Sequence, residues 1–207
     1  MHRRNFLDQI GRLSRLAEQV VVRQSSIVGA GSGVFTVQRV DRDCVLSLYP
    51  GFYYALPPVT SFVDGSPPFQ VSDLNRERLA NSRYIMSCDG GGFIDAAKEP
   101  RDISLKCGHI VNHSAQRWNS TAVTFLWSEL LKHHPRASQL LPGINRVDEG
   151  AIWFMSDEEQ PVYYNSSLVT LKGIAIVAAR PLDKDEEVLI DYKFNAREST
   201  GIPWYTN

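Results

Sequence analysis

Three consecutive residues near the middle of the chain, Asn112, His113 and Ser114, have side chains suited to binding a small polar ligand. An asparagine amide offers two donors and one acceptor, which are the groups that pair with the edge of an adenine ring. A histidine taken alone is more often a satisfied core residue than a catalyst. The motif therefore predicts a binding site at Asn112, with His113 as a structural neighbour.

A glycine-rich turn, Gly31-Ser32-Gly33, precedes the apolar pair Val34-Phe35. With Gly29 it superficially resembles a dinucleotide-binding loop. The sixth position is Val34 where that loop needs glycine or alanine, and strand-forming residues follow in place of a helix. No helix N-terminus would then face a pyrophosphate. A plain turn is the simplest interpretation of this segment.

Two tyrosines stand next to distinctive neighbours. Tyr49 opens the sequence Tyr49-Pro50-Gly51, and Tyr192 ends an apolar run that follows the acidic cluster at residues 185–187. The pKa of a free phenol is near 10, so both hydroxyls stay protonated at neutral pH. By default the acidic cluster is a solvated turn and a strand tyrosine is a core aromatic.

The elements that would position these residues are mainly short strands. From Ile27 onward, runs rich in β-branched and apolar residues alternate with turns, and residues 84–86 and 93–95 flank three glycines as a hairpin would. A helix is expected near residues 128–141, interrupted by Pro135. An amphipathic helix of about five turns is expected at the N-terminus, from apolar residues spaced by three and four: Phe6, Ile10, Leu13, Leu16 and Val20. The pattern predicts a β-rich α+β fold.

Composition limits the function further. The chain has 207 residues, a formal net charge of −1 and 43% hydrophobic residues, which indicate one globular domain and no electrostatic case for direct nucleic-acid or membrane binding. Three widely spaced cysteines predict neither a disulfide framework nor a metal site. Arg3-Arg4 is not followed by the apolar stretch of an export signal, so an intracellular protein of the nucleus or cytoplasm is expected.

Taken in order, the glycine turn, Tyr49-Pro50-Gly51, Asn112-His113-Ser114 and the acidic strand ending at Tyr192 resemble the SET-domain protein-lysine methyltransferases. The similarity spans residues 27–195 as scattered motifs, and includes residues 94–96 (Ile-Asp-Ala). Residues 45–51 and 140–144 are also similar to the group called SET-domain-containing protein nine. The loop after Asn112 departs from the family pattern Asn-His-Ser-Cys-x-Pro-Asn: it lacks the cysteine and the proline and is one residue longer.

The resemblance implies a SET domain of small curved sheets around a pseudoknot. The N-terminal helix is expected within residues 1–26, and the resemblance implies a domain over 27–195 with insertions near 57–87 and 127–160, followed by an aromatic flank over 196–207. S-adenosylmethionine is the implied cofactor, and Tyr192 and Tyr49 are the implied catalytic residues that shape a lysine channel. The residues expected to bind the cofactor are Gly31, Ser32, Gly33, Asn112, His113, Tyr192 and Trp204.

The implied activity is transfer of a methyl group to a lysine ε-amine of a protein or peptide substrate. An alternative is a catalytically inactive SET-fold module that binds cofactor or peptide, which the divergent loop at Ala115 and Arg117 favours. A β-rich structural protein with accidental motif matches is a third interpretation.

Overall fold

The fold is described by a computed structural model for residues 3–12, 19–54, 84–89, 92–97, 104–139, 145–147, 153–155, 161–163 and 171–192. Most of the predicted insertion near residues 57–87, and part of that near 127–160, lies outside these ranges. So does the predicted C-terminal flank with Trp204, together with the segment after Tyr192 on which the predicted pseudoknot depends.

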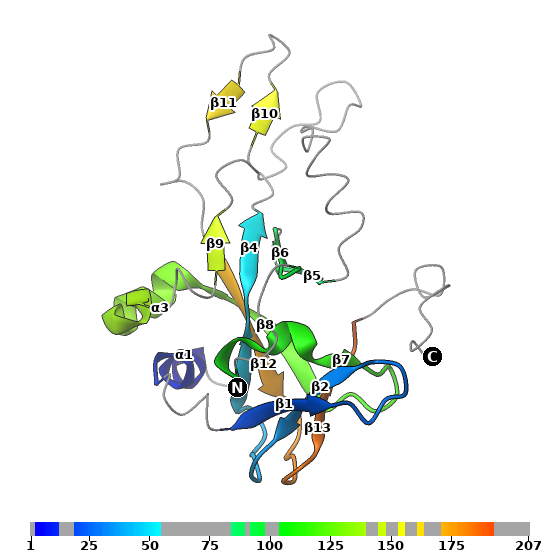
Figure 1. Ribbon diagram of the computed structural model, residues 1–207. Coiled ribbons are helices and arrows are strands. Elements are labelled where there is room, and N and C mark those ends of the chain that lie inside the picture. Colours follow the sequence, from blue (N-terminus) through cyan, green and yellow to red (C-terminus); the bar gives the residue numbers. More distant parts are fainter. Residues whose placement is uncertain are drawn as a thin grey trace.

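Seven of the described strands form one sheet, in the order β1-β2-β13-β8-β12-β3, with β7 paired to β13 (Figure 1). These strands are β1 (Val20–Gln24), β2 (Ser32–Thr36), β3 (Val45–Tyr49), β7 (Asn112–His113), β8 (Ser120–Leu126), β12 (Lys172–Ala178) and β13 (Glu187–Ile190). Every residue of β3 and of β13 is buried, which explains why both appear in the sequence as continuous runs rather than as alternating patterns.

A second sheet has the order β5-β6-β4-β9 and continues from the first through Pro50, which joins β3 to β4. Gly51 lies at this junction with φ of +129°, and a Cβ at this position would lie 2.3 Å from the carbonyl oxygen of Asp95. Glycine is therefore required where β4 passes β6. The strands are β4 (Gly51–Tyr54), β5 (Ile85–Ser87), β6 (Phe93–Asp95) and β9 (Asn145–Val147); β10 (Trp153–Met155) and β11 (Pro161–Tyr163) form a separate pair.

The N-terminal helix is shorter than predicted. Helix α1 spans Arg3–Gly11, residues 13–18 lie outside the described ranges, and Val20 begins β1 instead of ending the helix. The run Val20-Val21-Val22 explains the difference, because β-branched side chains favour a strand. The second predicted helix is confirmed in part: α3 spans Trp127–His133, and a 3₁₀ helix, η4 (Pro135–Gln139), begins at the proline. The other 3₁₀ helices within the described ranges are η2 (Ser104–Lys106) and η3 (Gly108–Ile110).

Helix α1 packs into the core beside α3 (Figure 1). Phe6, Leu7 and Ile10 are buried, and the Phe6 ring meets Phe125 of β8 edge to face, with 6.1 Å between ring centroids. The Gln9 amide accepts from the Val45 backbone N–H at 2.8 Å and donates to the Asp43 carbonyl at 3.1 Å. The helix is thus tied to β3 by both apolar and polar contacts.

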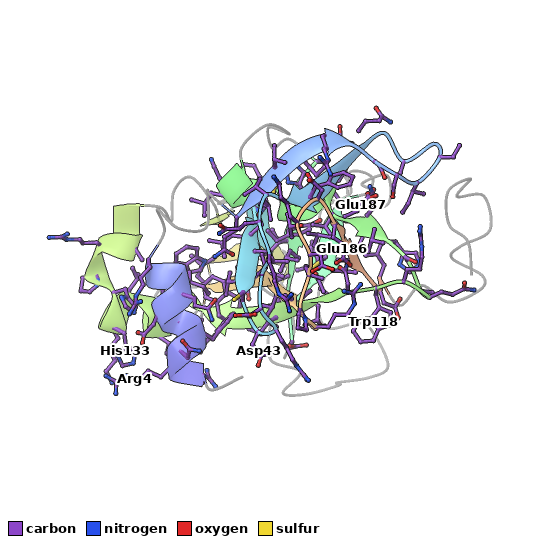
Figure 2. The ribbon with its side chains drawn as sticks, turned by 90° about the horizontal axis from the view of Figure 1, so that it is seen from below. Arg4, Asp43, Trp118, His133, Glu186 and Glu187 are labelled. Atoms are coloured by element: carbon purple, nitrogen blue, oxygen red, sulfur yellow. The ribbon has the colours of Figure 1, made fainter. Side chains whose placement is uncertain are left out.

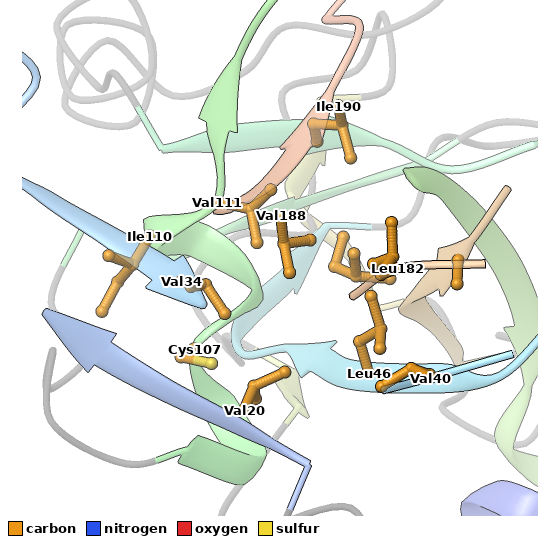
Figure 3. Close-up of a cluster of buried hydrophobic side chains, with 12 residues drawn as sticks. Val20, Val34, Val40, Leu46, Cys107, Ile110, Val111, Leu182, Val188 and Ile190 are labelled. Atoms are coloured by element: carbon orange, nitrogen blue, oxygen red, sulfur yellow. The ribbon is translucent and has the colours of Figure 1, made fainter. Parts of the chain in front are cut away.

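A second cluster of buried side chains lies under β13 (Figure 3). Val188 and Ile190 pack there against Val34 of β2, with Leu46 and Leu182 beside them. Because side chains alternate along a strand, Glu187 and Leu189 point to the opposite face of β13. The structure confirms the predicted β-rich α+β class, and all three cysteines are free thiols. Within the described ranges, no helix is long and apolar enough to cross a membrane.

We expect Ile10→Ala to lower the free energy of unfolding by about 2–5 kcal/mol, because it deletes a side chain with no exposed surface from the core. Arg4→Ala, on the exposed face of the same helix (Figure 2), should change it by less than about 0.5 kcal/mol. Urea unfolding of both variants measures the difference. Equal, small effects would show that α1 is not part of the cooperative domain.

Candidate functional site

Strand β13 brings the separate sequence motifs together. It pairs antiparallel with β2, where Val188 lies opposite Val34 just after the glycine turn. It also pairs parallel with β7, where Leu189 lies opposite Asn112 and Ile190 opposite His113. Residues that are far apart in the chain therefore become neighbours on one strand, which ends two residues before Tyr192.

The carboxylate of Glu187 is the centre of a buried polar network, named here the Glu187 network. It accepts hydrogen bonds from the Ser25 hydroxyl at 2.6 Å, the Ser26 backbone N–H at 2.9 Å, the Ser26 hydroxyl, and the Asn112 amide at 3.1 Å. Burial alone would raise the pKa of Glu187, but the bonds from Ser25, Ser26 and Asn112 outweigh it and lower the pKa. Glu187 is therefore ionised at neutral pH, although it is buried.

Gly33 leaves room for this carboxylate. A Cβ on residue 33 would lie 2.3 Å from Glu187 Oε1 and 3.2 Å from Asn112 Nδ2, so the Glu187 network occupies the space of a missing side chain. Gly31 has φ of +75°, in the region that favours glycine, and its carbonyl accepts from the Ser25 N–H across the β1–β2 hairpin. Lack of space therefore explains the glycine at residue 33, and the positive φ explains the glycine at residue 31.

Asn112 uses its amide nitrogen within the protein. Nδ2 donates to Glu187 Oε1 and, at 3.0 Å each, to Ser25 Oγ and the Ser32 carbonyl oxygen. Among the described residues, nothing donates a hydrogen bond to the amide oxygen. A ligand at Asn112 would thus meet an acceptor, whereas the adenine pairing predicted from sequence drew on both donor and acceptor.

His113 supports the end of β13. Its Nδ1 accepts a hydrogen bond from the Tyr192 backbone N–H at 2.9 Å, and its ring lies 5.3 Å from the Tyr192 ring, centroid to centroid. Burial lowers the pKa of His113, opposed by Asp191 and by the backbone of Ile190. The imidazole is therefore neutral at pH 7, as its acceptor role at Nδ1 requires, and it fixes the backbone that carries Tyr192.

Three tyrosines and a histidine form a second group, named here the tyrosine cluster, in which Tyr49 and His109 are buried and Tyr84 and Tyr192 are half-buried. The Tyr192 hydroxyl donates to the Val111 carbonyl, and burial together with Tyr84 raises the pKa of Tyr192. Burial raises the pKa of Tyr49 well above its usual value, with further contributions from Tyr192, Asp95 and Tyr84. These mutual effects arise because the phenols are close together, and they keep the hydroxyls protonated.

Sequence analysis missed two members of this cluster. The His109 ring meets both Tyr49 and Tyr84 edge to face, at 6.4 and 6.1 Å between centroids. Tyr84 is placed by the predicted hairpin, since the Ala96 N–H donates to the Tyr84 carbonyl beside β6. The predicted hairpin could therefore have indicated that Tyr84 lies near the site. For His109 the one signal was its position, because the family pattern usually has an arginine three residues before the asparagine that corresponds to Asn112.

A cleft of about 410 Å³ lies on the other face of β13, between the 25–31 loop and the 115–118 loop. Its lining includes Ser26, Trp118, Asn119, Glu187 and Leu189. Figure 2 shows Trp118, Glu186 and Glu187 at the same end of the molecule. This volume is in the range of small-molecule pockets, roughly 300–1,000 Å³.

Glu186 fixes the wall of this cleft. Its carboxylate accepts from Arg180 at 2.5 Å, from the Asp183 N–H at 3.0 Å and from the Asn119 amide at 3.1 Å. Burial would raise the pKa of Glu186, but Arg180 and the other donors outweigh it and lower the pKa. Both glutamates of the acidic cluster are therefore structural, not a solvated turn.

The structure gathers the predicted residues into two adjoining groups. Gly33 and Asn112 lie in the Glu187 network, while Tyr49 and Tyr192 lie in the tyrosine cluster, with His113 between the two. Ser25 and Ser26, which lie at the predicted boundary between residues 1–26 and the domain, belong to the first group. In the described part of the chain, no group of three or more His, Cys, Asp or Glu could hold a metal ion.

No protein-family model matches the sequence, and no curated protein matches it either. Solved structures do resemble the fold. CpSET8 from Cryptosporidium has 15% identity and a TM-score of 0.49, over 94% of this chain and 68% of that chain. A chain of ctPRC2, in an autoinhibited conformation bound to S-adenosylmethionine, has 14% identity and a TM-score of 0.45, over 86% of this chain and 15% of that chain.

A third structure is a Plasmodium falciparum protein provisionally described as a histone methyltransferase. It has 13% identity and a TM-score of 0.42, over 87% of this chain and 97% of that chain. At such identities and scores, function has to be inferred from the contacts within this chain.

We expect stability to fall as pH drops below about 4.5, the ordinary value of a glutamate, because the folded-state pKa of Glu187 lies lower. A lowered pKa contributes stability above the unfolded value and loses it as pH falls through the folded value. Glu187→Gln should lower the free energy of unfolding by about 1–3 kcal/mol at pH 7. It should also make the fall in stability between about pH 5 and 3 less steep than in wild type. Urea unfolding across pH measures both effects.

The matched control is Glu129→Gln, which breaks an exposed ion pair with Arg3. It should lower the free energy of unfolding by at most about 1 kcal/mol at pH 7. If Glu187→Gln were as mild as this control, the Glu187 network would not be a stabilising centre.

Proposed function

We propose that this chain has a SET fold and transfers a methyl group from S-adenosylmethionine to a lysine ε-amine of a protein substrate. The observation that carries the proposal is β13, which joins the glycine turn, Asn112-His113 and Tyr192 side by side. The sequence resemblance assigns these same segments to one cofactor site.

The residues present suit a cofactor with amine donors. Glu187 is ionised and holds the amide nitrogen of Asn112, which leaves the amide oxygen as an acceptor for an N–H group of the ligand. Gly31, Ser32 and Gly33 present backbone with little side chain beside it, so a ligand can lie close to the turn. The His113 backbone would complete this site. When bound, S-adenosylmethionine supplies a methyl group on a positively charged sulfur.

The tyrosine cluster suits the acceptor lysine. A lysine amine must be neutral to attack a methyl group, and its pKa is near 10.4 in water. Burial among aromatic rings lowers the pKa of an ammonium because the charged form loses its hydration. Tyr192 and Tyr49 stay protonated, so their role would be to orient the amine, and this orientation would supply most of the rate. Tyr84 would line the same channel.

A second candidate is a SET-fold module that binds cofactor or peptide without turnover. The loop at residues 115–118, which lacks the family's cysteine and proline, is the observation that favours it. Four points remain predictions from the sequence: the similarity to SET-domain-containing protein nine, an intracellular location, the domain boundaries and the role of Trp204.

We expect wild-type protein to bind S-adenosylmethionine, and Asn112→Ala to weaken binding roughly tenfold or more. The variant removes the acceptor and releases Glu187 from one partner. Isothermal titration calorimetry measures the affinity, and circular dichroism checks that the variant is folded. Asn5→Ala, an exposed amide on α1, is the control and should bind as wild type. Unchanged affinity in folded Asn112→Ala would remove Asn112 from the site.

Tyr192→Phe separates the enzyme from the inactive module. Wild type incubated with labelled cofactor and a cell extract should label protein lysines, and the variant should lose roughly tenfold or more of this labelling, because only the orienting hydroxyl is deleted. Tyr53→Phe, a buried tyrosine outside the cluster, should retain labelling. Cofactor binding by wild type without any labelling would favour the inactive module.

A further inference from the structure

We infer that the cleft lined by Trp118 holds the adenine ring of S-adenosylmethionine, and that the Trp118 indole stacks on that ring. The inference rests on the proposed function and assigns a residue that the family pattern does not contain. In that pattern a proline precedes the second asparagine, whereas this chain has Trp118 before Asn119 in a loop one residue longer.

The cleft adjoins the proposed cofactor residue Asn112. Ser26 and Glu187 line the cleft, and both also belong to the Glu187 network that holds the Asn112 amide. A ligand that reaches the Asn112 oxygen is thus one side chain away from the cleft. The 410 Å³ volume is sufficient for a nucleoside-sized group.

Trp118 is exposed in a way that packing does not explain. The residue is 49% exposed, and it is the one aromatic residue among the large hydrophobic residues that the described ranges leave exposed; the others are Val21, Val28 and Val37. An exposed indole offers a flat π face, on which a base stacks with little dependence on its hydrogen-bonding pattern.

The loop around Trp118 is anchored on both sides. Before it, the Arg117 N–H donates to the Ser114 hydroxyl at 3.0 Å. After it, Asn119 is buried: its N–H donates to the Leu189 carbonyl at 3.0 Å, and its amide donates to the Glu187 carbonyl at 2.7 Å. The backbone of Trp118 is therefore positioned by β13 before any ligand arrives, which lowers the cost of binding.

The charges of the cleft favour a nucleoside over a nucleotide. Arg117 and Arg180 line it together with Glu186 and Glu187, so the formal charges cancel, two positive against two negative. The Arg180 guanidinium is paired with Glu186. A phosphate would gain no net attraction there, while the amine of adenine can donate to the carboxylate side of the cleft.

The test compares Trp118→Ala and Trp118→Phe with wild type, using S-adenosylmethionine and adenosine as probes in calorimetry. Stacking on an aromatic ring predicts that Trp118→Ala weakens S-adenosylmethionine roughly 5- to 100-fold, while Trp118→Phe stays near wild type. Adenosine alone should bind weakly to wild type and compete with the cofactor. A fluorescence change on cofactor binding should be lost in Trp118→Phe. Val37→Ala, exposed at the other end of the β1–β2 hairpin, is the control.

The outcomes separate this inference from the proposed function. If wild type binds the cofactor and Trp118→Ala binds it equally well, the inference is wrong and the proposed function stands. If Trp118→Ala loses peptide labelling but keeps cofactor affinity, the cleft is a surface for the protein substrate, and the inference is again wrong. If wild type binds neither probe, the proposed function fails and the inference with it.

Discussion

The ionised carboxylate of Glu187, buried under Gly33, is the interaction on which the rest of the site depends. It joins the β1–β2 hairpin through Ser25 and Ser26 to Asn112 of β7, while its own backbone pairs β13 with β2. A buried charge is tolerated only when its lone pairs are satisfied, so all three segments must adopt their places together. This requirement excludes most alternative arrangements of the glycine turn relative to Asn112.

Strand β13 serves the core and the site at once. Val188 and Ile190 face the buried cluster under the sheet, whereas Glu187 and Leu189 face the cleft. Side-chain alternation makes this division sharp, because a register slip of one residue would put Glu187 into the apolar cluster. The apolar face of β13 therefore specifies where the polar residues of the other face lie. Stability and the proposed ligand binding would thus be coupled through one short strand.

Much of this arrangement follows from the sequence, but only at the level of elements. The runs at residues 33–37 and 188–192 predicted strands, and the family resemblance implied that Asn112 and Tyr192 meet. The sequence does not indicate which strands pair with one another. Ser25 and Ser26 therefore fell at a predicted boundary, although they donate hydrogen bonds to the carboxylate of Glu187, far along the chain. The N-terminal helix was predicted too long because its apolar spacing continues into a β-branched run that tertiary pairing makes a strand.

The Glu187 network and the tyrosine cluster differ in a way that fits the proposed reaction between a charged cofactor and an amine. On the Asn112 side, ionised Glu187 provides negative charge close to the acceptor oxygen. On the Tyr192 side, burial keeps the phenols neutral and His113 uncharged, so that side disfavours an ammonium. The Tyr192 N–H bonded to His113 Nδ1 connects the two sides rigidly. This difference in charge would attract a cationic ligand to the Asn112 side and promote loss of the amine proton on the Tyr192 side.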